Sequence, residues 1–324
     1  MRVQDFDYDL PADLIAQRPL ERRDGSRMMV LRRSDGTVSH RAFRDVPEFI
    51  NPGDLLVLND TKVIPAKAWG RRGEAAVEFL FLREKAAGVW DVLCKPARRV
   101  RLGETVFFAD GFQAEVVEAG EEGRRTLRFG EPDVLARLKK IGFAPLPPYI
   151  KRRKADASRR EEDLARYQTV YAAQEGAIAA PTAGLHFSPE ILGQIQGRGG
   201  RIVRVTLHVG LATFQPLRAE TLENHRMSEE SYAIPADAAA EINRARAEGR
   251  PVTAVGTTVV RALESAFINT GTHHLSPRPS DSEKIPGEIS HMSPQFRTTN
   301  LFIYPGFEFR VVDRLLTNFH LPRS

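Results

Sequence analysis

Two histidines at the ends of predicted strands are the side chains best placed to move protons. His186 stands in the segment PTAGLHF, just before a predicted helix whose dipole disfavours a charged imidazole. His208 closes the predicted strand RIVRVTLHVG, before glycine-spaced turns. A neutral imidazole accepts a proton, so both are candidate general bases. A lone histidine is more often a hydrogen-bonded packing residue, but two at neighbouring strand ends weaken that interpretation.

Other polar side chains stand at similar positions after predicted strands. The candidate binding residues are Thr182 and Gly184 in PTAGLHF, Gly210 in LHVGL, Asn59, Asp60 and Lys62 at and after the end of LLVLN, and Thr257, Thr258 and Arg261 after PVTAVG. The threonines open a predicted helix whose free backbone amides suit an anion or a carboxylate. Turn formation by Asn and Asp, and plain N-capping by Thr, are the alternative interpretations.

Two further segments contain groups that could bind or protonate a substrate. ENHRMSEESY combines acids, a base and a cation, and LLTNFHLP presents two hydrogen-bonding side chains around an aromatic ring that could stack on a nucleobase. Solvated surface charge and a buried aromatic residue are the simpler explanations. The candidates here are His225, Arg226, Glu229, Glu230, Asn318, Phe319 and His320.

The elements that must position these residues alternate between strand and helix, which predicts a mixed α/β core with parallel character. The predicted strands span 55–59, 177–181, 201–210 and 251–256. Helices are expected after Ser188 and Pro189, over 236–249, and from Thr257 onward. If the strands are parallel, their carboxyl ends share one edge of the sheet, where open α/β sheets bind ligands. One site would then contain both histidines.

Residues from about 70 to 145 have a different pattern, with short alternating strands such as VEFLFL, VWDVLC and ETVFFAD separated by turn residues. This pattern predicts a small antiparallel barrel or sandwich inserted in the chain. We therefore expect an α/β core formed by residues 1–66 and 151–324 and an inserted barrel-like domain over 67–150. Tyr167 and Tyr171, four residues apart, would share one face if their segment is helical.

Length and composition indicate a soluble protein of about two domains. The chain has 324 residues, its N-terminus lacks the basic and apolar regions of a signal peptide, and no window approaches about 18 apolar residues. A cytoplasmic location follows. The single cysteine, Cys94, cannot form an internal disulfide or by itself supply a zinc site, so it is expected in a strand core and no metal is expected.

The positive charge favours an anionic partner. The net charge is +5, the pI is near 9.4, and basic residues gather in two clusters. A phosphate backbone is a natural ligand for such clusters, although a solvated loop without a partner would look the same. The candidate RNA contacts are Arg98, Arg99, Lys151, Arg152, Arg153 and Lys154.

Several common catalytic signatures are absent from the sequence. It contains no Walker loop, GxGxxG, GxSxG or HExxH. A methyltransferase that uses S-adenosylmethionine would normally have a glycine-rich turn after its first strand, whereas LLVLNDTKV continues with Asp60 and Thr61. The methyltransferase alternative therefore lacks its signature.

Long segments spread over residues 5–322 resemble one known family. FDYDLPADLIAQRPLERRDGSRMMVL, GDLLVLNDTKVIPA, YQTVYA, GAIAAPTAGLHF, LHVGLATFQPL, HRMSEESY, VGTTVVRALES and LTNFHLP occur in this order. Together they resemble the S-adenosylmethionine:tRNA ribosyltransferase-isomerases of queuosine biosynthesis. The resemblance implies an α/β core with an inserted small β-barrel, no metal, and S-adenosylmethionine as ribosyl donor and co-substrate.

The implied reaction attaches the ribosyl group to 7-aminomethyl-7-deazaguanine at the wobble position of tRNA and rearranges it, giving epoxyqueuosine-tRNA with release of adenine and methionine. His186 and His208 are then candidate bases. Candidates for the other roles are His320, His225 or a neutral Glu229 for adenine departure, Asp60 and Tyr167 near the sulfonium, and Thr257, Thr258 and Arg261 for the methionine carboxylate. A monomer is expected.

The resemblance also carries an expectation about the C-terminus. Members of the family continue past the LPxS segment with an apolar helix, whereas this sequence stops at Ser324. Either the sequence is truncated here or the protein is a shortened member, and a noncatalytic tRNA-binding relative is the alternative function if the truncation is genuine.

Overall fold

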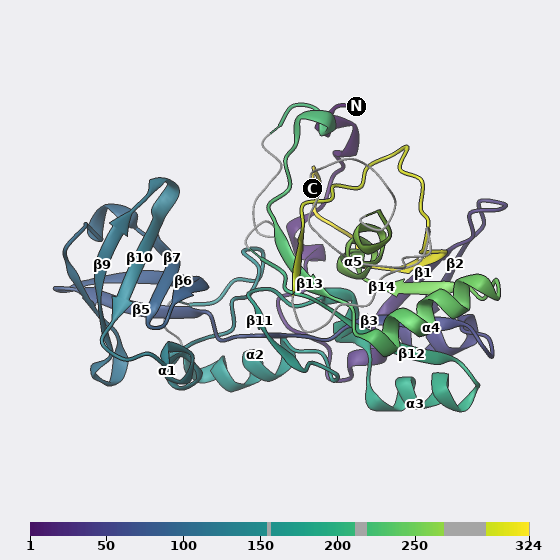
Figure 1. The fold of residues 1–324 in the computed structure, drawn as a ribbon, viewed down its shortest axis with the longest axis horizontal. Coiled ribbons are helices and arrows are strands. Elements are labelled where there is room, and N and C mark those ends of the chain that lie inside the picture. The colour runs from purple at the N-terminus through teal and green to yellow at the C-terminus, as the bar shows by residue number, and fades with distance from the viewer. Residues whose placement is uncertain (154–156, 211–218, 269–295, 324) are drawn as a thin grey trace, which may run out of the picture.

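The computed structural model describes residues 1–153, 157–210, 219–268 and 296–323. The candidate RNA contact Lys154 and residues 211–218 of the LHVGLATFQPL segment lie outside this range. A closed six-stranded barrel occupies one end of the molecule, and a six-stranded mixed sheet with helices on both faces occupies the other (Figure 1). The predicted mixed α/β fold with a small β-barrel is thus confirmed.

The main sheet has the strand order β15-β13-β12-β3-β14-β16. Its four neighbours β12, β3, β14 and β16 are parallel, while β13 and β15 run antiparallel at one side. All five residues of β3 are buried, as expected for a strand covered on both faces. The strands are β3 Leu55–Asn59, β12 Arg201–Leu207, β13 Glu230–Ala233, β14 Val252–Val255, β15 Arg297–Thr299 and β16 Arg314–Leu316.

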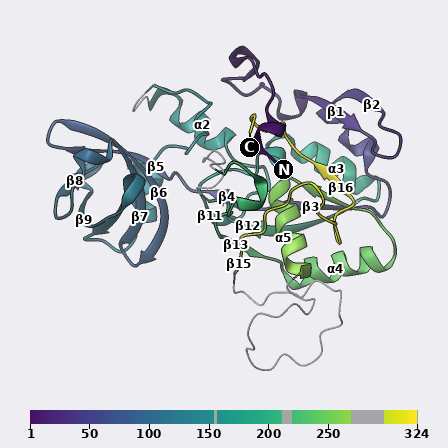
Figure 2. The same ribbon diagram turned by 90° about the horizontal axis from the view of Figure 1, so that it is seen from above.

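Helices cover this sheet as the sequence predicts. Helices α4 Ala236–Ala247 and α5 Thr257–Ile268 share one hydrophobic cluster with β3, while α3 Pro189–Gly197 contributes to another cluster that contains Leu56 and Leu58 (Figure 2). The side chain of Ser188 accepts a hydrogen bond from the Ile191 amide, which caps α3 as predicted. None of the helices in the described ranges is long and apolar enough to cross a membrane.

The barrel is antiparallel throughout and closes in the order β10-β7-β6-β5-β8-β9. Phe79, Phe81 and Phe112 fill its core, and Cys94 is buried there as predicted. Its strands are β5 Lys67–Arg72, β6 Ala75–Ala86, β7 Val89–Lys95, β8 Thr105–Phe107, β9 Gln113–Ala119 and β10 Arg124–Phe129. Helices α1 Val134–Ile141 and α2 Arg160–Arg166 follow, and a separate hairpin pairs β1 Arg27–Leu31 with β2 Val38–Ala42.

The prediction of a strand over 177–181 is wrong. The strand there, β11, spans Gln174–Ala177 and pairs with β4 Thr61–Val63 in a separate two-stranded sheet. After β11, consecutive side chains pack in different hydrophobic clusters. Ile178 packs in the cluster that fills the barrel, and Ala179 packs in the cluster that includes α5. A chain that divides its side chains in this way cannot keep the two-face alternation of a strand.

The conditional prediction that Tyr167 and Tyr171 share a helix face is also wrong. Helix α2 ends at Arg166, and the side chain of Gln168 then bonds both the amide and the carbonyl of Val63. This pairing to β4 holds the chain away from a helical path. Both tyrosines are buried, in two different clusters.

Candidate functional site

Asn59 joins three elements at the carboxyl edge of the sheet. Its side chain is fully buried, and its amide nitrogen donates to the Leu207 carbonyl at 2.9 Å and to Thr258 Oγ1 at 3.2 Å. Its Oδ1 accepts from the amides of Leu207 at 3.0 Å and Thr61 at 3.2 Å. These four bonds use the hydrogen-bonding capacity of the amide, so Asn59 positions β12, β4 and α5 rather than offering a free group.

His208 lies directly after β12 and is held from several sides. Its Nδ1 is 2.8 Å from Thr61 Oγ1, and its ring centroid is 4.8 Å from that of Phe296. Its backbone amide donates to the Ser231 carbonyl on β13. Burial lowers the pKa of His208, which favours the neutral imidazole at neutral pH.

His186 is the last residue of a 3-10 helix, Thr182–His186, that precedes α3. Its Nε2 is 3.1 Å from the amide nitrogen of Asn318, and its ring packs against Phe43 with centroids 5.1 Å apart. Burial lowers the pKa of His186, and the charge of Arg23 acts in the same direction, while a hydrogen bond to the Arg23 backbone opposes them. This imidazole is therefore also neutral at neutral pH.

The loop that carries His186 is anchored by its neighbours. The guanidinium of Arg23 donates to the carbonyls of Leu185 at 3.2 Å and Ala165 at 3.0 Å. On the other side, the hydroxyl of Tyr171 lies so close to Gly184 that a Cβ added there would be 2.1 Å from it. Gly184 is thus a close-packing residue in this structure.

The residue that contacts His186, Asn318, follows β16. The approach to β16 is held by the fully buried carboxylate of Glu264 on α5, which accepts hydrogen bonds from the amides of Arg310, Val311 and Val312. A carboxylate that accepts several backbone N–H groups needs no cation to be satisfied. Helix α5 thereby sets the path of the segment that reaches His186.

The structure places the two histidines in separate polar clusters. No hydrogen bond between described residues joins His186 to His208. The clusters approach each other at the turn between β14 and α5, where a Cβ on Gly256 would lie 3.5 Å from Thr258 Oγ1 and 3.8 Å from Ala183 Cβ. Joint action of His186 and His208 on one substrate stays a prediction.

The side chains of Asp60 and Lys62 have different partners. Asp60 is buried, accepts a hydrogen bond from Thr206 Oγ1 at 2.6 Å, and has a pKa raised by burial, which the Thr206 bond opposes. Lys62 forms an ion pair of 2.9 Å with Glu175, which also binds Lys139 at 2.9 Å. Burial therefore disfavours the charged form of Asp60, whereas Lys62 already has a carboxylate partner.

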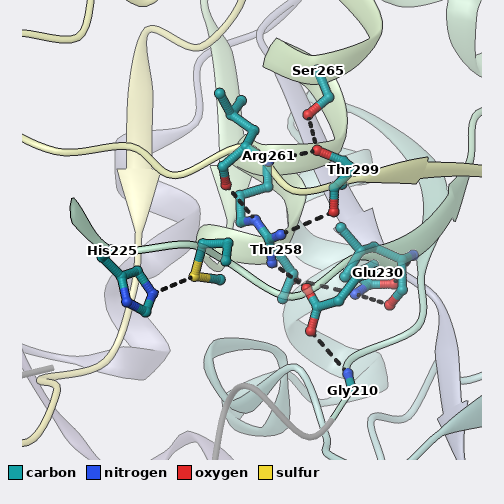
Figure 3. A network of polar contacts seen from close by, with 11 residues as sticks. Gly210, His225, Glu230, Thr258, Arg261, Ser265 and Thr299 are labelled. Atoms are coloured by element: carbon teal, nitrogen blue, oxygen red, sulfur yellow. Dashed lines mark hydrogen bonds and ion pairs between the residues drawn. The ribbon is translucent and has the colours of Figure 1, made fainter. Parts of the chain in front are cut away.

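A buried ion pair between Glu230 and Arg261 lies at the same sheet edge (Figure 3). Their side chains are 2% and 12% exposed, and Glu230 also accepts from the Gly210 amide at 2.9 Å. Arg261 donates in addition to the carbonyl of Leu301 at 3.0 Å. Because its guanidinium is already bound in this way, a direct contact with a substrate carboxylate would need these bonds to rearrange.

Glu230, rather than the predicted Glu229, is the acid that enters this network. Glu229 is exposed, whereas Glu230 begins β13 and points inward with Tyr232. The sequence made both acids candidates but gave no reason to prefer Glu230, and the role in adenine departure was predicted for Glu229. The alternation of Glu230, Tyr232 and Ile234 is the strand signal that separates it from Glu229.

The remaining candidates make other contacts. His225 contacts Met227 Sδ at 3.3 Å (Figure 3), and its ring centroid is 4.7 Å from that of Phe302. The carbonyl of His320 accepts a hydrogen bond from the Tyr8 hydroxyl, and Phe319 is 82% exposed. An aromatic ring this exposed is free to meet a partner.

The predicted RNA contacts divide into free and paired cations. Arg98, Arg99, Lys151 and Arg153 are exposed. Arg152 instead forms a bidentate ion pair with Asp163, at 2.8 and 2.9 Å. Its charge is therefore largely compensated within the protein.

Fold and site together define a mixed α/β protein with a β-barrel and a polar region of neutral imidazoles at its sheet edge. In the described part of the chain, no group of three or more His, Cys, Asp or Glu residues could hold a metal ion. The family model described as "Queuosine biosynthesis protein" matches residues 3–324. The chain belongs to this family, and it is an enzyme of queuosine biosynthesis.

Curated relatives agree with that assignment. The S-adenosylmethionine:tRNA ribosyltransferase-isomerase of Desulfitobacterium hafniense is 43% identical over 328 residues, which cover 100% of this chain and 89% of that protein. Its namesake from Moorella thermoacetica is 45% identical over 329 residues, with coverage of 100% and 89%. A crystal structure of S-adenosylmethionine tRNA ribosyltransferase from Thermotoga maritima is 32% identical, covers 99% of this chain and 86% of that one, and has a TM-score of 0.48. The family resemblance inferred from the sequence segments is confirmed.

Proposed function

We propose that the chain transfers the ribosyl group of S-adenosylmethionine to 7-aminomethyl-7-deazaguanine at the wobble position of tRNA and isomerises it. Epoxyqueuosine-tRNA, adenine and methionine are the products. The observation that carries the proposal is the family match over residues 3–324, together with relatives of that activity that align with all of this chain. Cytoplasmic location, a monomeric state and catalysis without a metal belong to the same proposal.

The reaction needs a base for the acidic carbon beside the sulfonium, and a base that leaves the attacking amine neutral. The candidates for these steps are the neutral imidazoles His186 and His208. The lowered pKa of each supports the assignment, because a protonated ring could accept nothing.

The sulfonium needs a nearby carboxylate or aromatic face. Asp60 suits this role, because a cation beside a buried carboxyl group favours its ionised form and would offset the burial that raises its pKa. Tyr167 is the aromatic candidate, although it is buried. For the methionine carboxylate, exposed Thr257 and the first amides of α5 are better available than Thr258 or Arg261, which have partners in the protein.

For adenine departure, the proposed donors are His225, His320 and Glu229. His225 is partly buried, so its imidazole can be held in place, whereas Glu229 and His320 are exposed. The other proposed substrate contacts lie next to the two histidines. Backbone groups are proposed to bind substrate at Thr182, Gly184 and Gly210, and side chains from the C-terminal segment at Asn318 and Phe319.

Product analysis tests the proposal. Incubation with S-adenosylmethionine and tRNA that carries the aminomethyl base should release adenine and methionine in equal amounts and convert the tRNA base. Release of S-adenosylhomocysteine would indicate methyl transfer instead. Retained tRNA binding without any turnover would favour the noncatalytic relative.

The barrel is the proposed carrier of tRNA contacts. Replacing Arg98 and Arg99 with glutamine should weaken tRNA binding and reduce the slope of log K against log salt by about 0.9 for each lost phosphate contact, without changing S-adenosylmethionine binding. Titrations at several salt concentrations measure this slope.

The matched control removes two exposed arginines from the hairpin at the other end of the molecule, Arg27 and Arg33 (Figure 1). Their replacement with glutamine should leave the slope nearly unchanged. Equal effects of both pairs would mean that only net charge matters.

The proposal also includes the domain division, with residues 1–66 and 151–324 forming the α/β core and residues 67–150 forming the inserted barrel domain.

A further inference from the structure

The ring of His208 is packed between Gly176 and Phe296. Gly176 has φ +150°, and a Cβ there would lie 3.0 Å from His208 Cε1 and Nε2, so the imidazole packs directly on the glycine backbone. Phe296 packs against the same ring. Together with the 2.8 Å contact between Nδ1 and Thr61 Oγ1, these neighbours determine which nitrogen meets the protein and which does not.

The hydroxyl of Thr61 decides where the imidazole proton sits. Thr61 is fully buried in β4, and within the described residues its hydroxyl has one hydrogen-bond partner, His208 Nδ1. A buried O–H that donates to nothing costs about 1 to 3 kcal/mol. The arrangement that avoids this cost has Thr61 donating to Nδ1.

A neutral imidazole carries its hydrogen on one nitrogen only. When Nδ1 accepts from Thr61, that hydrogen is on Nε2. Nε2 has no hydrogen-bond acceptor among the described residues. It is also not among the fully buried side-chain atoms that lack a partner, so a ligand can reach it. The nitrogen left for a ligand therefore presents an N–H group.

We propose that His208 acts as a neutral hydrogen-bond donor through Nε2, and that Thr61 is the positioning residue that fixes this tautomer. The inference rests on the proposed function and changes one assignment within it: His208 becomes the donor for adenine departure, in place of His225, His320 or Glu229, and is no longer a candidate base. The acceptor is a ring nitrogen of the departing adenine, which gains the electron pair when its bond to the sugar carbon breaks. No proton has to leave the imidazole, since the N–H group stabilises the developing negative charge by hydrogen bonding, and the departing base takes its proton from water to give neutral adenine.

This assignment separates the roles of the two histidines. At His186, the amide nitrogen of Asn318 faces Nε2, so that nitrogen carries the lone pair. His186 thus has the accepting tautomer and His208 the donating one. Of the two candidate bases, His186 remains as the proton acceptor.

The tautomer can be observed directly in the whole protein. Long-range ¹H–¹⁵N correlation spectra with labelled histidine distinguish Nε2–H from Nδ1–H rings, and loss of one signal in His208→Gln assigns it. We expect the Nε2–H pattern in the wild type and in Thr61→Ser, and a shift toward Nδ1–H in Thr61→Val, which has the same shape but no hydroxyl. An Nδ1–H ring in the wild type would overturn the proposal.

Turnover provides the second readout. Thr61→Val should lower kcat for adenine release by about 10- to 100-fold with little change in KM for S-adenosylmethionine, and Thr61→Ser should restore most of it. Equal kcat values in all three proteins would also overturn the proposal. If the wild type releases no adenine, the proposed function fails, while the spectra still report the tautomer.

Discussion

Replacing His186 with alanine should lower the turnover of the enzyme by about 10² to 10⁴-fold, the range usually lost with a general base. Its neutral ring, its accepting Nε2 and its place at the end of an anchored loop all support the role of proton acceptor. Adenine release under saturating substrate is the measurement. Binding of S-adenosylmethionine should change far less, because the alanine variant removes an acceptor and not a charge.

The matched control for this variant is His40→Ala, which removes an exposed imidazole from β2 and should leave turnover unchanged. The pH profile gives an independent check. The pKa of His186 is lowered from its ordinary value of about 6.5, so the neutral form persists at neutral pH and activity should fall only as the pH drops below that value. A loss of less than about tenfold in His186→Ala would remove it as the base.

Gly184→Ala should destabilise the protein by about 1 to 3 kcal/mol, the usual cost of overpacking, and should displace the loop that carries His186. The new Cβ would lie 2.1 Å from the Tyr171 hydroxyl and 3.0 Å from Thr169 Cγ2, and both residues are buried and cannot swing into solvent. Urea unfolding followed by circular dichroism measures the stability, and adenine release measures the displacement.

A second substitution separates this clash from other effects of the alanine. Tyr171→Phe removes the hydroxyl and leaves the ring carbon 3.2 Å from the added Cβ, so the double variant should recover part of the lost stability and activity. The matched control, Gly193→Ala, adds a Cβ in open space on α3 and should not destabilise the protein. Additive losses in the double variant would show that the Tyr171 contact is not the cause.

Local signals predicted much of the fold. The apolar run of β3, the Ser188 cap of α3 and the alternating strands of the barrel depend on neighbours in sequence, and they appear where expected. The run at 177–181 misled because apolar content alone does not distinguish a strand from a loop whose side chains enter several cores.

Partners distant in sequence limited what could be predicted of the site. Asn59 was a plausible binding residue until its amide was found bonded to Leu207 and Thr258, about 150 to 200 residues away. Arg152 belonged to a basic run, but folding brings it to Asp163. Which polar groups remain free after folding depends on such contacts, and a single sequence does not contain them.

The loop before His186 is short, yet its residues enter all four hydrophobic clusters of the described structure. Ala177 and Ala180 belong to the cluster of Tyr167, Ile178 to that of the barrel, Ala179 to that of α5, and Ala183 to that of α3. To open this loop alone, the protein would have to disrupt packing in each core at once. Local unfolding of the loop should therefore cost more free energy than that of a loop packed against a single core.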